Sequence, residues 1–282
     1  MNTVKTFFLM MALTGLLVII GAGLGGEAGI VIALAFALAM NGFAYWSSDK
    51  IALKMAHAHP VTERDDPELY SIVAEQASLA GLPMPKVHEI ASESPNAFAT
   101  GRSPKKATVA VTTGIRRILT REELGAVLAH EMAHVGNRDT LIMAMVATIA
   151  GAISMLAFMA QISAIFGGMR GDRGGGGNII GLLVIAIIMP LAASIIRLAI
   201  SRAREYQADA TGARNSGNPY ALASALEKLE MGSRARPLKV AEGASHLFIV
   251  NPLSGASMAK LFSTHPPVAE RVRRLREMPP NY

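Results

Sequence analysis

The sequence predicts a mainly α-helical membrane protein in which four hydrophobic helices accompany a soluble part with a small β-sheet. Three observations predict this class. Half of the chain is apolar, with 51% hydrophobic residues among 282. Four runs are apolar over the length of about 20 helical residues that crosses a hydrocarbon core. Nearly all of the charge lies in two other stretches, which we therefore expect to be soluble.

The first two apolar runs predict a transmembrane hairpin within residues 1–46. They cover about 6–24 and 28–46, and only Glu27 carries a charge between them. A cleaved signal peptide is an alternative for the first run, because Lys5 precedes it and small residues follow it. In both cases the second run returns the chain to the cytoplasm.

The other two runs predict a second membrane hairpin within residues 141–200. They cover about 141–168 and 178–200, and a glycine-rich turn separates them. The sequence leaves open whether they cross the membrane fully or only enter it. Basic residues gather on the cytoplasmic side of membrane helices, and here they follow the second run and flank the fourth: Lys50, Lys54, Arg197, Arg202 and Arg204. The soluble stretches 47–140 and 201–282 should therefore face the cytoplasm.

Charge and cysteine content narrow the function. The net charge of +6 does not indicate nucleic-acid binding, because Lys and Arg are spread along both soluble stretches without an aromatic stacking pattern or an RNA-binding signature. The chain has no cysteine, which excludes disulfides and fits a reducing compartment. Any metal must therefore be held by His, Asp or Glu.

A candidate metal site lies on a helix predicted over about 121–135. The segment 120–123 has the form of a capping box, and apolar residues then recur at helical spacing. Within this helix, His130 and His134 belong to an HExxH sequence, which places both imidazoles on one face. The intervening Glu131 can reach a metal-bound water, which makes it the candidate general base. The alternative for an isolated HExxH is an ordinary amphipathic helix whose histidines are solvated or satisfied in a core.

Topology supplies a third ligand. Two neutral imidazoles and one carboxylate suit Zn²⁺ when a fourth position stays open for water or a substrate carbonyl. The HExxH helix ends just before the third apolar run, and the fourth run brings the chain back to the same side. Glu205 and Asp209 lie there on one face of a predicted helix. We expect Glu205 to be the third zinc ligand and Asp209 to accept the free N–H of a ligand imidazole.

Together these motifs resemble the family of integral-membrane zinc metallopeptidases that includes HtpX, the bacterial heat-shock membrane protease, and the eukaryotic CAAX prenyl proteases. The resemblance covers nearly the whole chain: the N-terminal hairpin, SPNAFATG at 94–101, the HExxH helix, RAREYQAD at 202–209 and STHPPVAER at 263–271. It implies a zincin-like (gluzincin) metalloprotease domain with one zinc ion per chain. It also implies a multi-pass protein of the bacterial inner membrane that cleaves misfolded or damaged membrane proteins in quality control and the stress response.

The resemblance implies a substrate-binding segment as well. Asn96, Ala97 and Phe98 match the family segment along the active-site cleft. A strand is predicted next to them over 107–113 by its Val and Thr content. A strand edge beside the zinc would bind an extended substrate by strand addition. The alternative is a core strand with an exposed turn.

Two further residues are implied near the zinc. His265 and Arg271 match family positions where they would stabilise the oxyanion of the tetrahedral intermediate. The alternatives are a turn residue before two prolines for His265 and a solvated helix face for Arg271.

The sequence thus predicts a zinc endopeptidase acting on membrane-protein and unfolded-protein substrates at the cytosolic face of a lipid bilayer. A transporter or channel is one competing class, but the apolar runs hold no buried acid or base of the kind that marks a transport path. A catalytically silent scaffold is the other. Glu131 argues against it, because a structural zinc site fills all four positions with protein ligands and needs no free carboxylate.

Overall fold

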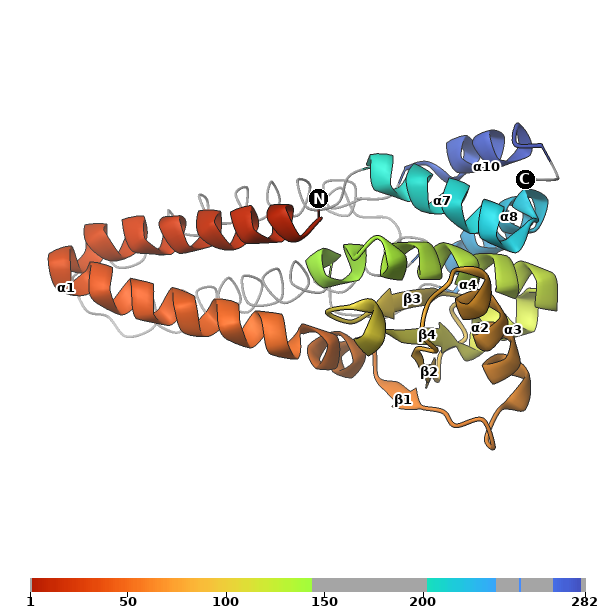
Figure 1. The fold of residues 1–282 in the computed structure, drawn as a ribbon, viewed down its shortest axis with the longest axis horizontal. Helices are drawn as coiled ribbons and strands as arrows, with labels where there is room; N and C mark the ends of the chain where they lie inside the picture. The colour runs from red at the N-terminus through yellow and green to blue at the C-terminus, as the bar shows by residue number, and fades with distance from the viewer. Residues whose placement is uncertain (1, 144–201, 237–248, 250–265, 280–282) are drawn as a thin grey trace, which may run out of the picture.

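The computed structural model describes residues 2–143, 202–236, 249 and 266–279, which form a long helical hairpin and a helical region with one small sheet (Figure 1). The expectation of a mainly helical protein with a small sheet is therefore confirmed. Nearly all of the second predicted membrane hairpin, 141–200, lies outside the described residues, and so does His265.

Helix α1, Asn2–Met55, is folded back on itself (Figure 1). The reversal falls at the predicted break between the first two apolar runs, at Gly26, whose φ of +56° is a left-handed value that glycine adopts without steric cost. Asn41 joins the two limbs, because its Nδ2 donates to Thr14 Oγ1 at 2.9 Å. In the described part of the chain, one stretch, Gly26–Ser47, is long and apolar enough to cross a bilayer. Four membrane helices therefore stay a prediction.

A four-stranded mixed sheet lies beside the end of this hairpin. Its strands are β1 (Ala58–Pro60), β2 (Lys86–Ile90), β3 (Ala97–Thr100) and β4 (Thr108–Thr112), in the order β1-β2-β4-β3. β2 and β4 pair in parallel, and both outer pairs are antiparallel. The strand predicted over 107–113 is β4, which is an inner strand. The edge strand next to it is β3.

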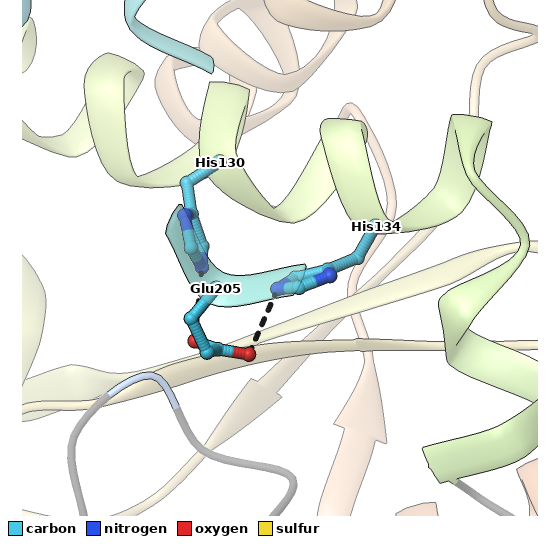
Figure 2. Close-up of side chains that lie close together, drawn as sticks. All are labelled: His130, His134 and Glu205. Atoms are coloured by element: carbon cyan, nitrogen blue, oxygen red, sulfur yellow. Dashed lines mark ion pairs between the residues drawn. The ribbon is translucent and has the colours of Figure 1, made fainter. Parts of the chain in front are cut away.

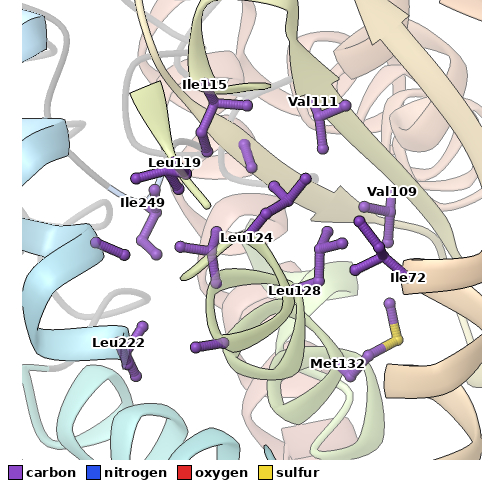
Figure 3. Packing of buried hydrophobic residues seen from close by; sticks show 14 of the residues in the cluster. Ile72, Val109, Val111, Ile115, Leu119, Leu124, Leu128, Met132, Leu222 and Ile249 are labelled. Atoms are coloured by element: carbon purple, nitrogen blue, oxygen red, sulfur yellow. The ribbon is translucent and has the colours of Figure 1, made fainter. Parts of the chain in front are cut away.

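The two faces of the sheet pack against different helices. One face packs against α2 (Pro67–Leu79) and α4 (Arg121–Gly136) and forms the main core with them. This core includes Ile72, Val109, Val111 and Leu128 (Figure 3). The other face packs against the end of α1 in a second cluster, which includes Ala52, Ala56, Ile90, Phe98 and Ala110. Since successive strand residues point to opposite faces, coverage on both sides explains why β3 and β4 are buried along their whole length.

Helix α4 begins where the sequence predicts. Thr120 Oγ1 accepts from the N–H of Glu123, and Glu123 Oε2 accepts from the N–H of Thr120. This capping box satisfies two of the N–H groups that a helix start would leave unpaired. Every residue from Glu123 to Val135 is buried, because α4 runs between the sheet and the C-terminal helices (Figure 1).

The C-terminal helices cover α4 on the side away from the sheet. They are α7 (Arg202–Ser216), α8 (Pro219–Ala235) and α10 (Val268–Arg276); two short helical elements, η1 (Pro104–Lys106) and α3 (Thr113–Ile118), flank β4. Helix α7 approaches α4 closely at Gly212, where a Cβ would lie 2.7 Å from His130 N and 2.8 Å from its Cα. A residue without a side chain is therefore needed here, and the close approach brings the first turns of α7 alongside the HExxH sequence.

Candidate metal centre

The three predicted ligands converge between α4 and α7. His130 Nε2 lies 3.9 Å from Glu205 Oε2, and His134 Nε2 lies 3.5 Å from Glu205 Oε1. One ligand atom from each residue lies within 4.8 Å of the other two, and all three residues are buried. Figure 2 shows both rings and the carboxylate turned toward one another. Side chains from helices that are distant in sequence thus share one small volume.

Each imidazole has an aspartate at its other ring nitrogen. His130 Nδ1 lies 3.0 Å from Asp209 Oδ1, and a hydrogen bond between them stays a prediction. His134 Nδ1 lies 3.1 Å from Asp139 Oδ2. The sequence does not predict a role for Asp139, because α4 ends at Gly136 and helical periodicity carries no information beyond that end. The available signal was an acidic residue just before an apolar run.

Arg271 donates two hydrogen bonds to Asp209. Its Nε donates to Asp209 Oδ2 at 2.8 Å, and its Nη2 donates to Asp209 Oδ1 at 2.7 Å. Its Nη1 donates to the main-chain carbonyl of Ile249 at 3.1 Å. Although burial alone would raise the pKa of Asp209, the guanidinium of Arg271 lowers it to about 2. Asp209 therefore stays ionised beside His130.

Glu131 lies on α4 beside the cluster but faces β3. Its Oε2 accepts the N–H of Ala99 at 2.8 Å, so the sheet fixes the direction of the carboxylate. In the metal-free protein the pKa of Glu131 is raised to about 7, chiefly by burial, while the charge of His134 lowers it and that of Glu205 raises it. Such a carboxylate can both accept and return a proton near neutral pH.

The charges around the two rings fit a divalent cation. Four buried carboxylates, Glu131, Asp139, Glu205 and Asp209, face two buried guanidinium groups, Arg204 and Arg271. With all four carboxylates ionised and both rings neutral, the site has an excess of two negative charges, which is costly in a buried site without a cation. Burial opposes protonation of His134, yet the surrounding carboxylates raise its pKa to about 9. Two imidazoles and one carboxylate are also a donor set that suits zinc, so the residues present fit the ion.

Comparison with known proteins agrees with this geometry. Residues 63–279, which contain all of these side chains, match the peptidase family M48. The chain belongs to peptidase family M48. M48 peptidases are metalloproteases that use a metal, typically zinc, and this chain is accordingly a metalloprotease whose candidate metal site is the group of His130, His134 and Glu205.

Relatives of this M48 peptidase are similar over almost their full length. A protease HtpX homolog of Syntrophobacter fumaroxidans is 54% identical over 277 residues, which cover 97% of this chain and 98% of the relative. A protease HtpX homolog of Thermodesulfovibrio yellowstonii is 55% identical over 282 residues, which cover 100% of both chains. The likeness therefore includes α1 as well as the metal centre.

A solved structure supports the fold of the M48 peptidase. The crystal structure of S. mikatae Ste24p superposes with a TM-score of 0.53 at 19% identity, over 96% of this chain and 67% of that chain. At this level of identity the likeness shows that the two proteins share a fold.

The predicted substrate segment of the M48 peptidase lies on and beside β3. Asn96 is fully buried, and its main-chain N–H donates to Thr112 Oγ1 at 2.9 Å. Ala97 lies on the sheet face that α4 covers. The side chain of Phe98 is fully buried in the second cluster, on the face toward α1. The side chain of Phe98 therefore holds the strand in place and does not line the metal centre.

Proposed function

We propose that this M48 metalloprotease is a zinc endopeptidase that cleaves misfolded or damaged membrane proteins, and unfolded protein segments, at the cytosolic face of a bacterial inner membrane. The observation that carries the proposal is the buried group of His130, His134 and Glu205 with Glu131 beside it. The similarity to proteases named HtpX supports a role in membrane-protein quality control and the stress response.

Glu131 is the general base and acid of the proposed reaction, and His130, His134 and Glu205 would hold one zinc ion per chain. Bound zinc would supply a Lewis acid for the scissile carbonyl and would lower the pKa of a bound water. Glu131 takes a proton from the attacking water and passes it to the leaving amine. Before substrate binds, the hydrogen bond from the Ala99 N–H holds this carboxylate in place.

The edge of β3 is the proposed site for an extended substrate. Asn96 O accepts from Thr112 N–H, so alternate residues point their main-chain groups away from β4. Two of these outward groups belong to Ala97, whose carbonyl accepts the N–H of Ile249 at 3.2 Å, and to Ala99, whose N–H donates to Glu131. A substrate strand that pairs here would exchange these contacts for its own main-chain hydrogen bonds and would place its backbone beside Glu131.

Oxyanion stabilisation by His265 and Arg271 stays a prediction. His265 lies outside the described residues. Arg271 has its Nη1 4.0 Å from Glu205 Oε2, while its other nitrogens bond Asp209. Its contacts favour an indirect role, in which Arg271 holds Asp209 against His130.

The proposed membrane arrangement has four parts. Residues 1–46 form a transmembrane hairpin and 141–200 form a second one, while 47–140 and 201–282 form the cytosolic catalytic region. The described structure supports the first part, because α1 reverses at Gly26 and exposes large apolar side chains, including Phe8, Ile32, Phe36 and Trp46. Such a surface suits the hydrocarbon core of a lipid bilayer.

The test combines zinc content with cleavage of casein by the purified full chain in detergent. The wild type should hold one zinc per chain and cleave casein. Glu131→Gln should keep the zinc and lose cleavage, because the amide keeps the shape of the side chain but cannot accept the proton. Substantial proteolysis by Glu131→Gln would reject Glu131 as the general base.

A second variant tests the metal site. Glu205→Ala should lower the zinc content, because it leaves two imidazoles as ligands, and an unchanged content would reject Glu205 as the third ligand. Zinc in the wild type without cleavage would favour a scaffold or an enzyme that needs a partner. Ion flux in reconstituted vesicles without proteolysis would favour a transporter. A wild type without zinc would overturn the proposed function.

A further inference from the structure

The chain turns sharply after α4 so that Asp139 faces back toward the metal centre. Helix α4 ends at Gly136, and Arg138 then adopts a φ of +59°. A left-handed conformation is sterically unfavourable for a residue other than glycine. The strained turn carries Asp139 under the last turn of the helix, where it is 2% exposed. The unfavourable conformation of Arg138 therefore places the carboxylate of Asp139 beside the proposed ligand His134.

The contact of Asp139 with His134 selects one form of the imidazole. His134 Nε2 faces Glu205 at 3.5 Å, whereas its Nδ1 faces Asp139 Oδ2 at 3.1 Å. A metal bound at Nε2 needs the lone pair of that nitrogen, so the proton must reside on Nδ1. Asp139 accepts that proton in a hydrogen bond and fixes the plane of the ring. Without it, the ring could rotate and either nitrogen could carry the proton.

Arg204 stands behind Asp139 from the other helix. Its Nη1 lies 3.6 Å from Asp139 Oδ1, and the residue is 9% exposed. Within the described part of the chain, neither Nη atom of Arg204 has a hydrogen-bond partner. The carboxylate that forms an ion pair with this buried charge there is that of Asp139. Arg204 also directly precedes Glu205. The pair therefore joins the end of α4, after His134, to the start of α7, which carries the third proposed ligand.

We propose that Asp139 is a positioning residue for His134 and that Arg204 holds Asp139 in place, so that this pair sets the zinc affinity of the centre. The inference rests on the proposed function, because it takes His134 to be a zinc ligand. It extends that function by adding a support for the second imidazole and by linking it to Glu205. Asp139 and Arg204 also flank the predicted membrane hairpin, so the pair ties together the two ends of that segment.

The experiment measures the zinc dissociation constant of the full chain in detergent, by competition with a chelator. Asp139→Ala should raise the constant by about 10–100-fold, the effect usual for partners of metal-bound histidines. Asp139→Asn keeps an acceptor oxygen for Nδ1 and should raise it less. Arg204→Met should also raise it, whereas Arg202→Met, an exposed arginine on the same helix, should leave it unchanged. Glu63→Gln, which removes an exposed acid, is the control for charge.

A double variant separates positioning from general damage to the fold. If Arg204 acts through Asp139, then Arg204→Met added to Asp139→Ala should change the constant by less than about twofold. Circular dichroism of each metal-free variant shows whether it is folded, and Asp139→Asn serves if Asp139→Ala is not. Absorption spectra of the Co²⁺-loaded protein should shift in Asp139→Asn, because the ligand imidazole loses the negative charge that raises its basicity.

Two results would overturn the inference. One is a zinc dissociation constant of folded Asp139→Ala or Asp139→Asn that matches the wild type. The other is a full additive effect of Arg204→Met in the double variant. The failure of the proposed function is distinguishable from both, because His134→Ala would then retain zinc with wild-type affinity. If His134→Ala loses zinc while the Asp139 variants keep it, the proposed function stands and this inference alone fails.

Discussion

The two imidazoles of the metal centre are supported in different ways. Behind His130, Asp209 is clamped by Arg271 through two hydrogen bonds of 2.7 and 2.8 Å. Behind His134, Asp139 meets Arg204 at 3.6 Å and no hydrogen bond joins the pair. The first support joins α7 to α10, and the second joins the end of α4 to the start of α7. The contact of Arg271 with Asp209 is thus hydrogen-bonded, whereas that of Arg204 with Asp139 is a longer electrostatic contact.

The difference is visible in the protonation of the two rings. Burial lowers the pKa of His130, and Asp209 offsets this only in part because Arg271 already balances its charge. Burial also disfavours the charged form of His134, yet Asp139, Glu205 and Glu131 outweigh it and raise the pKa to about 9. Without metal at pH 7, His130 is therefore neutral and His134 carries a proton that zinc would displace if it binds as proposed. The longer contact, between Arg204 and Asp139, therefore lies behind His134, the ring whose charge would change when metal binds.

The largest expected effect comes from removing the tighter clamp. Arg271→Met leaves the buried, ionised Asp209 without its guanidinium partner, and breaking a buried ion pair in this way costs about 3–5 kcal/mol of stability. Arg204→Met should cost less, because its pair with Asp139 is longer and lacks a hydrogen bond. Urea unfolding of the metal-free proteins in detergent, followed by circular dichroism, gives both values. Equal losses would show that the two supports do not differ in strength.

Helix packing should have the next largest effect, because both supports depend on how α7 lies against α4. Gly212→Ala would place a Cβ 2.7 Å from His130 N, so the helices must separate, at a cost of about 1–3 kcal/mol. We expect zinc affinity to fall as well, because Glu205 moves away from both rings. Chelator competition and urea unfolding measure the two effects.

Gly136→Ala is the matched control for this change. Gly136 lies in α4, and a Cβ there would approach Leu82 no closer than 3.9 Å, an ordinary contact. Alanine also has the higher helix propensity, so this variant should be unchanged or more stable by about 0.5–1 kcal/mol. A similar loss in both glycine variants would mean that the approach at Gly212 is not what positions α7.

The sequence predicts the aspartate behind His130 but not the one behind His134. The ligands and Asp209 follow from spacing within single helices, since His130 and His134, like Glu205 and Asp209, lie four residues apart. Asp139 follows a left-handed residue beyond a helix end, where no periodicity applies. The strand over 107–113 was correctly placed, but its inner position depends on a parallel pairing with β2 that only the tertiary fold determines.

The zinc affinity compares the two aspartates directly. Asp209→Asn and Asp139→Asn each remove one negative charge and keep an acceptor oxygen for Nδ1. Asp209→Asn should have the larger effect within the usual range of about 10–100-fold, because it also leaves Arg271 buried without its carboxylate. Chelator competition at pH 7 gives both constants. A larger loss for Asp139→Asn would show that the looser contact matters more to the metal than the clamp does.

The smallest effect, and the one most specific to the comparison, is the pH dependence of the metal-free protein. His134 has a pKa of about 9 when folded against 6.5 unfolded, so its contribution to stability is complete below pH 6.5 and is lost as the pH rises through 9. Glu131, with a folded pKa of about 7, acts in the same direction but is nearly exhausted by pH 8. The thermal midpoint should therefore fall between pH 8 and pH 10. Asp139→Asn should flatten this fall, because it removes a carboxylate that keeps His134 protonated, whereas Asp209→Asn should leave its slope unchanged. If the thermal midpoint of Asp139→Asn falls with pH as steeply as that of the wild type, Asp139 does not keep His134 protonated.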